Sequence, residues 1–158
     1  MNSIYPFFKW VDGTWLSKAI NDSKWLFPAI EGVHIVALAL LFGAVIVLNL
    51  RLLGIGIRNR PVSELAEELA PWTFCSLIII LISGVFLFVT EATKSYRSMP
   101  FRIKIALLVT AIVFHYTVSR RIVSREGGGH PGLAKVAAVF AIALWVSVGL
   151  AGRAIGFF

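Results

Sequence analysis

The sequence is poor in charged side chains. Asp, Glu, Lys and Arg make up only 15% of its 158 residues, whereas a soluble domain carries about 25%. Hydrophobic residues make up 58%, and the mean hydropathy is +0.85. A chain of this composition has too few polar side chains to cover its surface in water. This excludes an ordinary soluble domain and predicts a membrane protein.

Cysteine and acidic residues are also scarce. The single cysteine, Cys75, excludes an intrachain disulfide and any CxxC metal or redox motif. The 8 acidic residues stand against 15 basic ones, which gives a formal net charge of +7 at pH 7. Because the basic residues lie at the ends of apolar segments, we expect them to meet lipid phosphates, with no nucleic acid as partner. No motif for hydrolytic or nucleophilic catalysis is present, so we expect no enzyme of those classes.

Four apolar segments approach the roughly 20 helical residues that a bilayer requires. Backbone groups in lipid find partners only within their own helix, and the connections between the segments are short. We therefore predict an all-α fold, an integral membrane bundle of four helices with up-down-up-down topology. The predicted helices cover residues 25–53, 71–92, 101–122 and 132–156, within one bundle of residues 25–158.

The N-terminal residues 1–24 have a different pattern. Trp15, Leu16 and Ile20 fall on one face of a helix, with Lys18 elsewhere around it, and further aromatic residues lie nearby. Aromatic rings at headgroup depth and a polar opposite face are typical of helices that lie in the membrane interface. The sequence therefore predicts an N-terminal amphipathic interfacial helix.

Small residues form stripes on the predicted helices. On the second, Ser83 and Thr90 lie seven residues apart with Gly84 beside them, and on the fourth Gly149 and Gly152 share a face. Such stripes let helix backbones approach closely, and hydroxyl groups can bond across the contact. We interpret them as packing within the bundle rather than as a dimer seam.

Polar side chains inside a membrane span are costly, so each is a candidate functional group. In the predicted topology the start of the first helix lies level with the end of the second, the start of the third and the end of the fourth. One level then holds Glu31, His34, Glu91, Arg102, Lys104 and Arg153, and the other holds Asn49, Arg51, His115 and Arg120. The first group is expected to form either an ion-pair network that seals the helix ends or a pocket for an anionic group, such as a haem propionate or a quinone.

His34 and His115 are the two imidazoles inside the predicted spans. A pair of neutral imidazoles on facing helices is typical of b-type haem in a membrane bundle, so both are predicted cofactor or metal ligands. A rise of 1.5 Å per residue separates them by roughly 10–15 Å along the membrane normal, which disfavours one shared haem. The alternatives are a single histidine ligand, two separate sites, or no cofactor. His34 is favoured because Glu31, one turn earlier, can orient its ring.

Copper is the alternative metal. Imidazole suits Cu(II), but a Cu(I) path prefers thiolates and thioethers, and the chain offers only Cys75, Met1 and Met99, far apart in sequence. Three functions follow from these candidates. They are a b-type haem-binding or redox-associated membrane subunit, a non-catalytic accessory subunit of a membrane complex with partner subunits, and a copper-handling membrane protein.

Several motifs carry a resemblance that covers nearly the whole chain. They are residues 25–34 (WLFPAIEGVH), 49–54 (NLRLLG), 100–104 (PFRIK) and 151–153 (AGR), together with Phe114-His115. With these motifs the chain resembles an uncharacterised family of small bacterial four-helix inner-membrane proteins, a domain of unknown function. The resemblance implies a multi-pass protein of the bacterial inner membrane and names no activity.

A more distant resemblance rests on His34 and on Gly43 nine residues later. This spacing is similar to the first helix of copper-resistance D type and related haem-associated membrane proteins. The similarity implies that a histidine of the first helix is a ligand in the wider group.

Overall fold

Helices account for almost all of the described chain. The computed structural model describes residues 4–56, 59–124 and 131–154, and no strand occurs within these ranges. In order along the chain, the elements are α1 (Tyr5–Asp12), α2 (Trp15–Asp22), α3 (Leu26–Leu52), α4 (Val62–Thr90), α5 (Ala92–Arg97), α6 (Met99–Phe114), the π-helical turn η1 (His115–Ser119), α7 (Arg120–Ser124) and α8 (Pro131–Ala154).

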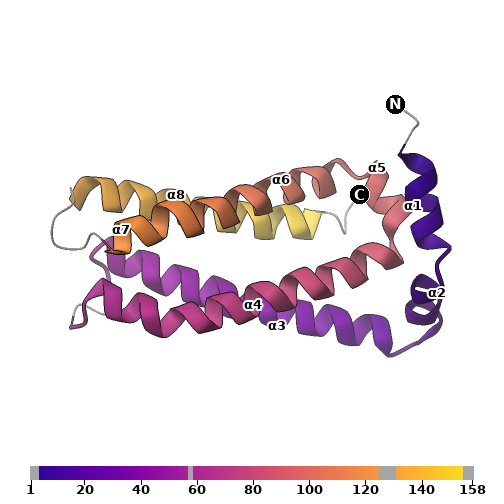
Figure 1. The fold of residues 1–158 in the computed structure, drawn as a ribbon, viewed down its shortest axis with the longest axis horizontal. Helices are drawn as coiled ribbons and strands as arrows, with labels where there is room; N and C mark the ends of the chain where they lie inside the picture. The colour runs from indigo at the N-terminus through magenta and orange to yellow at the C-terminus, as the bar shows by residue number, and fades with distance from the viewer. Residues whose placement is uncertain (1–3, 57–58, 125–130, 155–158) are drawn as a thin grey trace.

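Four stretches of helix are long and apolar enough to span a membrane. They are Leu26–Leu52, Val62–Thr90, Met99–Val123 and Gly132–Arg153. Successive stretches run antiparallel, so that α3 and α4 form one pair and α6 and α8 the other (Figure 1). Contacts between α3 and α8 join the two pairs. The predicted all-α chain with four helices able to span a membrane is confirmed, and these helices indicate a membrane-embedded protein.

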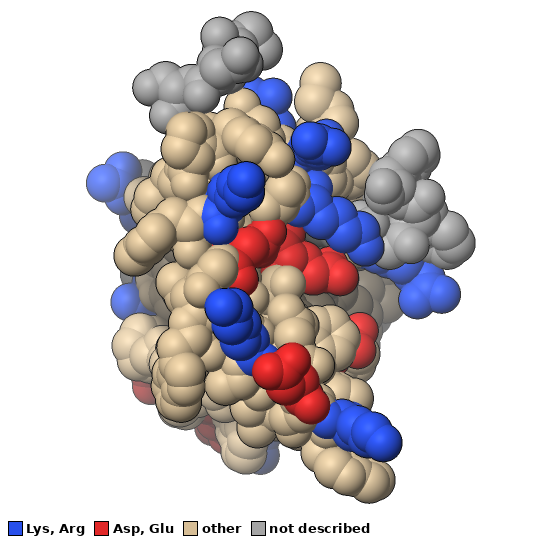
Figure 2. All heavy atoms as spheres, turned by 90° about the vertical axis from the view of Figure 1, so that its right-hand side faces the viewer, with Lys and Arg blue, Asp and Glu red and all other residues tan. Residues whose placement is uncertain are grey.

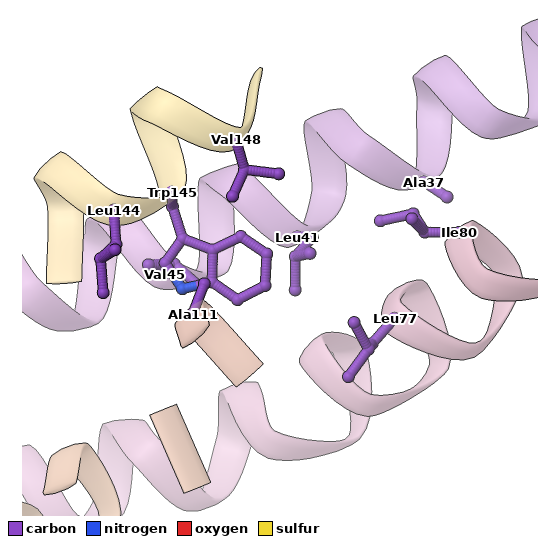
Figure 3. Close-up of a cluster of buried hydrophobic side chains, with 9 residues drawn as sticks. All are labelled: Ala37, Leu41, Val45, Leu77, Ile80, Ala111, Leu144, Trp145 and Val148. Carbon is purple, nitrogen blue, oxygen red and sulfur yellow. The ribbon is translucent and has the colours of Figure 1, made fainter. Parts of the chain in front are cut away.

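The hydrophobic core lies where the two helix pairs meet. Leu41 and Val45 of α3 are 0% and 1% exposed, and Trp145 of α8 is 3% exposed. Figure 3 shows the Trp145 indole pointing from α8 toward α3, with Ala111 of α6 beside it. The Phe42 ring meets this indole edge to face, with ring centroids 6.4 Å apart. Ala111 is the one fully buried residue that α6 adds to the cluster, so α6 is the least enclosed of the four long helices.

The second spanning helix begins earlier than the sequence predicted. It was expected to begin at Pro71, but α4 begins at Val62, so it includes the acidic segment of residues 63–69 and carries Pro71 inside. Val62 and Leu65 are buried, so the acidic segment packs against the bundle and continues the helix. Proline lacks the N–H that would bond to the carbonyl four residues earlier, at Glu67. The Thr73 hydroxyl donates to the carbonyl of Leu69 at 2.9 Å, one turn away from this interruption.

The third span is a helix with one irregular turn. It was predicted over residues 101–122, and in the structure α6, η1 and α7 follow one another without a break from Met99 to Ser124. The π-helical turn covers His115–Ser119. Such a turn holds an extra residue compared with an α-helical one, and it is frequent at functional sites.

The N-terminal segment forms two short helices where one was predicted. The chain turns at Gly13 and Thr14, and the Thr14 hydroxyl caps α2 by accepting from the Ser17 N–H at 3.4 Å. Both helices lie across the end of the bundle (Figure 1). Trp10 and Trp15 remain exposed, as expected for side chains at headgroup depth.

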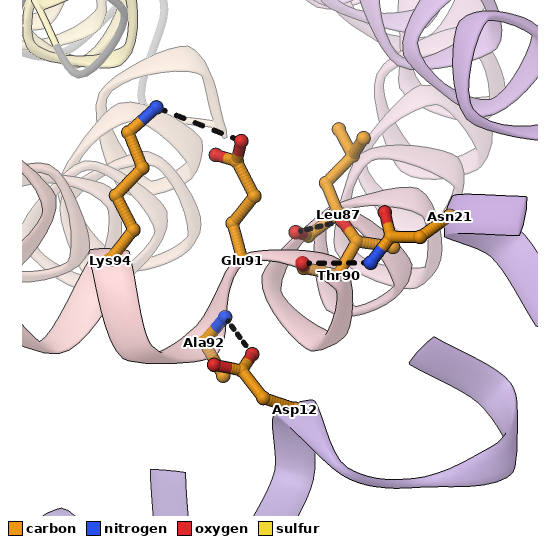
Figure 4. Close-up of polar contacts among 7 residues, drawn as sticks. All are labelled: Asp12, Asn21, Leu87, Thr90, Glu91, Ala92 and Lys94. Atoms are coloured by element: carbon orange, nitrogen blue, oxygen red, sulfur yellow. Dashed lines mark hydrogen bonds and ion pairs between the residues drawn. The ribbon is translucent and has the colours of Figure 1, made fainter. Parts of the chain in front are cut away.

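Polar contacts hold these two helices to the bundle. The Asp12 carboxylate accepts from the backbone N–H groups of Ala92 and Thr93 at 2.8 and 3.0 Å, which caps the start of α5. The Asn21 side chain donates to the carbonyl of Thr90 at 3.3 Å. Figure 4 shows the Asp12–Ala92 and Asn21–Thr90 contacts at the junction of α4 and α5, where Glu91 also pairs with Lys94.

Candidate functional site

His34 is a buried polar side chain between the first two spanning helices. Its exposed fraction is 8%, and its Nδ1 lies 2.8 Å from the Ser83 hydroxyl oxygen on α4. Gly84, the next residue of α4, leaves room for the ring, since a Cβ at that position would lie 3.5 Å from the His34 Cε1. The Ser83–Gly84 pair therefore provides both the hydrogen-bond partner and the space for this imidazole.

The hydrogen bonds around Ser83 assign the tautomer of His34. The Ser83 hydroxyl has one proton, and its nearest acceptor is the carbonyl of Ile79 at 2.5 Å. With that proton given to the backbone, Ser83 accepts from His34, so the His34 proton lies on Nδ1. The Nε2 of the neutral ring then carries a lone pair. A histidine whose other nitrogen is fixed in this way is in the state that a metal ligand or proton acceptor requires.

Lys104 brings a positive charge to the same region. Its side chain is half-buried and crosses Gly152 of α8, where a Cβ would lie 3.4 Å from its Nζ. Lys104 is the sixth residue of α6 and His34 the ninth of α3, so both side chains come from the same end of the bundle. Within the described residues Lys104 takes part in no hydrogen bond or ion pair. An ammonium group without a partner among the described residues, at the same end of the bundle as a lone pair on nitrogen, is suited to a ligand that carries an anionic oxygen.

The other charged residues of this level lie at the surface. Figure 2 shows this end of the molecule, where acidic side chains lie in the middle and Lys and Arg side chains surround them. Glu91 pairs with Lys94 at 3.6 Å, and Glu31 is exposed, with no ion pair to a described residue. Arg102 and Arg153 are also exposed. The Glu91–Lys94 pair is exposed, and exposed pairs of this kind stabilise little.

His115 lies at the wall of a cavity at the other end of the bundle. The cavity has a volume of about 750 Å³ and lies between α3, α4 and the segment from η1 to α7. Its lining residues are Leu48, Ser63, Ala66, Glu67, Leu69, Ala70, Pro71, Thr73, Phe74, His115, Tyr116, Arg120, Arg121 and Val123. Leu48, which lines this cavity together with His115, follows His34 by fourteen residues on α3, which is about 20 Å along the helix. The structure therefore places the two histidines at different levels.

Asn49 is the neighbour of Leu48 on α3 and therefore lies at the same end of the bundle as the cavity. It is buried, with an exposed fraction of 2%. Its side-chain nitrogen donates to the carbonyl of Val45 at 2.7 Å, within the same helix. Its oxygen Oδ1 is buried and has no hydrogen-bond partner among the residues that the structure describes. A buried amide oxygen of this kind carries an unmet desolvation penalty.

Sequence reasoning identified both histidines but not their surroundings. The hydroxyl stripe on α4 had been interpreted as packing, and its spacing alone does not reveal that Ser83 bonds to His34. Tyr116 and Glu67 line the cavity although neither was singled out. Among the described residues no group of three or more His, Cys, Asp or Glu side chains is placed to hold a metal ion.

Comparison with known families agrees with the motif resemblance. A family model described as "Family of unknown function (DUF6644)" matches residues 7–158. The chain belongs to this family. No curated protein and no solved structure matches the chain. The distant similarity to copper-resistance D type proteins therefore has no support beyond the spacing of His34 and Gly43.

Proposed function

We propose that this family member binds a redox-active prosthetic group inside the membrane through His34, with b-type haem as the first candidate. The observation that carries the proposal is the His34–Ser83 hydrogen bond, because it leaves the Nε2 lone pair available in a buried imidazole. A bound haem supplies one-electron transfer. The resemblance to small inner-membrane proteins supports the bacterial inner membrane as its location.

Lys104 provides the second part of this site. Its ammonium group comes from the same end of the bundle as His34 and has no partner among the described residues, and it suits the anionic side groups of a haem or the oxygen atoms of a quinone. His115 is too far along the bundle to act as the partner ligand of His34 on an upright haem. The proposal therefore assigns the group to His34 and Lys104, with His115 outside the site.

A visible spectrum tests the proposal. Protein expressed with a haem precursor and then purified is expected to give a reduced-minus-oxidised spectrum of the b type. His34→Ala is expected to lose this spectrum, and His115→Ala, the matched histidine at the other level, is expected to keep it. Colourless wild-type protein would contradict the proposal, and loss of the spectrum in both variants would indicate a shared group.

The second candidate function is an accessory subunit of a membrane complex. The observation in its favour is the exposure of the third span. Only 6% of its most apolar stretch is buried inside the protein, whereas 33–39% of the corresponding stretch is buried in each of the other three spans. A helix with so little internal packing leaves a long apolar face for lipid or for another membrane protein. Wild-type protein that is colourless, and that is extracted from membranes in a complex larger than its own monomer, would favour this function.

A further inference from the structure

We propose that the cavity beside His115 binds one anionic phospholipid, with an acyl chain inside the cavity and the phosphate at its arginine side. This site is separate from the His34 site, and the proposal does not depend on the proposed function of His34. Its volume of about 750 Å³ lies in the range of about 300–1,000 Å³ that is typical of ligand pockets.

The walls of the cavity fit an acyl chain. Leu48 comes from α3, Leu69, Ala70 and Phe74 come from α4, and Val123 comes from α7. These side chains are apolar and lie within or near the membrane-spanning part of the bundle. A small inorganic anion gains nothing from such walls, whereas a lipid tail is stabilised by them.

The backbone around the cavity is irregular on two sides. On α4, Pro71 leaves the Glu67 carbonyl without its usual donor, and on the opposite wall His115 begins the π-helical turn. Irregular helix at membrane depth is tolerated where it lines a cavity or is buried in protein. Both interruptions lie at the same cavity, which is the pattern of a binding site rather than of two unrelated defects.

The charges at the cavity favour an anionic headgroup. Its charged lining residues are Arg120, Arg121 and Glu67, so the balance is one positive charge, and His115 and Tyr116 add polar groups. The guanidinium of Arg120 lies over the Tyr116 ring, 5.5 Å from its centroid, which holds the arginine at the edge of the cavity. Arginine binds phosphate through paired hydrogen bonds. Because the lining carries a net positive charge, a headgroup with a net negative charge matches this edge better than a zwitterionic one, in which a cation offsets the phosphate.

Native mass spectrometry after delipidation tests the site. Purified protein is incubated with equal amounts of phosphatidylglycerol and phosphatidylcholine, and the expected result is one retained phosphatidylglycerol per chain. Arg120→Gln is expected to lower the preference for phosphatidylglycerol about tenfold, since one charge-assisted contact is lost. Ala70→Phe and Ala66→Phe, which fill the cavity, are expected to lose retention of both lipids.

Matched variants control for general effects of substitution. Arg102→Gln removes an exposed arginine from the other end of the same span, and Ala106→Phe adds a ring at an exposed position of α6. Both are expected to retain lipid as the wild type does. Equal retention of both lipids by the wild type, or undiminished retention by both cavity-filling variants, would overturn the proposal. Binding of inorganic phosphate alone with the same dependence on Arg120 would also overturn it, because it would identify a free anion as the ligand.

Discussion

At the scale of single residues, the contact between His34 and Ser83 is the best-defined polar interaction inside the bundle. It joins α3 to α4 across a sequence distance of 49 residues and fixes both the position and the tautomer of the ring. Interhelical hydrogen bonds in membrane proteins are individually modest, at about 0.6 kcal/mol on average and up to about 1.7. The contact therefore orients His34 more than it stabilises the fold.

Replacing Ser83 measures this contribution. Ser83→Ala removes the acceptor of the Nδ1 proton, so the free energy of unfolding in mixed detergent micelles is expected to fall by about 1 kcal/mol. Ser147→Ala is the control, because Ser147 donates to the carbonyl of Ala143 in its own helix. Its effect is expected to be within about 0.5 kcal/mol. Equal losses in the two variants would mean that the His34 contact contributes nothing of its own.

At the scale of helices, glycine sets the distance between α3 and α8. A Cβ at Gly149 would lie 3.0 Å from the Cζ of Phe42, and the Phe42 ring is itself packed edge to face on Trp145. Gly43 offers the opposite case, since a Cβ there would meet nothing within 4 Å. Both glycines lie inside a spanning helix, so the comparison between them isolates close packing from helix propensity.

Substitution by alanine is expected to have opposite effects at these positions. Gly149→Ala forces the Phe42 ring to move, and we expect a loss of about 1 kcal/mol, at the lower end of the cost of overpacking. Gly43→Ala is expected to be neutral or to stabilise by about 0.5–1 kcal/mol, because alanine favours the helix. Unfolding in mixed micelles measures both. A Gly149→Ala protein as stable as the wild type would show that the ring moves freely.

The sequence predicted the spanning helices better than their irregularities. The long apolar runs are sufficient to predict four spans, but proline is favoured at the first positions of a helix, so the sequence predicts a helix start at Pro71. The helix begins instead at Val62, since Val62 and Leu65 find buried positions against the bundle. The π-helical turn at His115 has no sequence signature of this kind. It depends on packing between helices, which the sequence alone does not describe.

The candidate site could be predicted only in part for a similar reason. The level of His34 and Lys104 in the membrane follows from residue counts, and the sequence placed both at the same end. Their surroundings depend on the rotation of each helix about its axis. The bond from His34 to Ser83 and the passage of Lys104 across Gly152 are set by that rotation.

At the scale of the whole molecule, the two histidines define two sites at opposite ends of one bundle. His34 lies with Ser83 in the half that α1 and α2 cover, and His115 lies at the cavity near the start of α4. His115 lines the cavity that Leu48 also lines, and Leu48 lies about 20 Å along α3 from His34, so the two histidines do not share one ligand. A group bound at one site therefore faces a different side of the membrane from a group bound at the other.

Labelling of single cysteines by a membrane-impermeant maleimide tests this separation most directly. In a Cys75→Ser background, Lys18→Cys marks the end that carries α2, Arg97→Cys marks the end of α5, and Asn59→Cys marks the connection between α3 and α4. Lys18→Cys and Arg97→Cys are expected to react from one side of the membrane, and Asn59→Cys from the other. Reaction of all three positions from the same side would contradict the spanning bundle and the separation of its two sites.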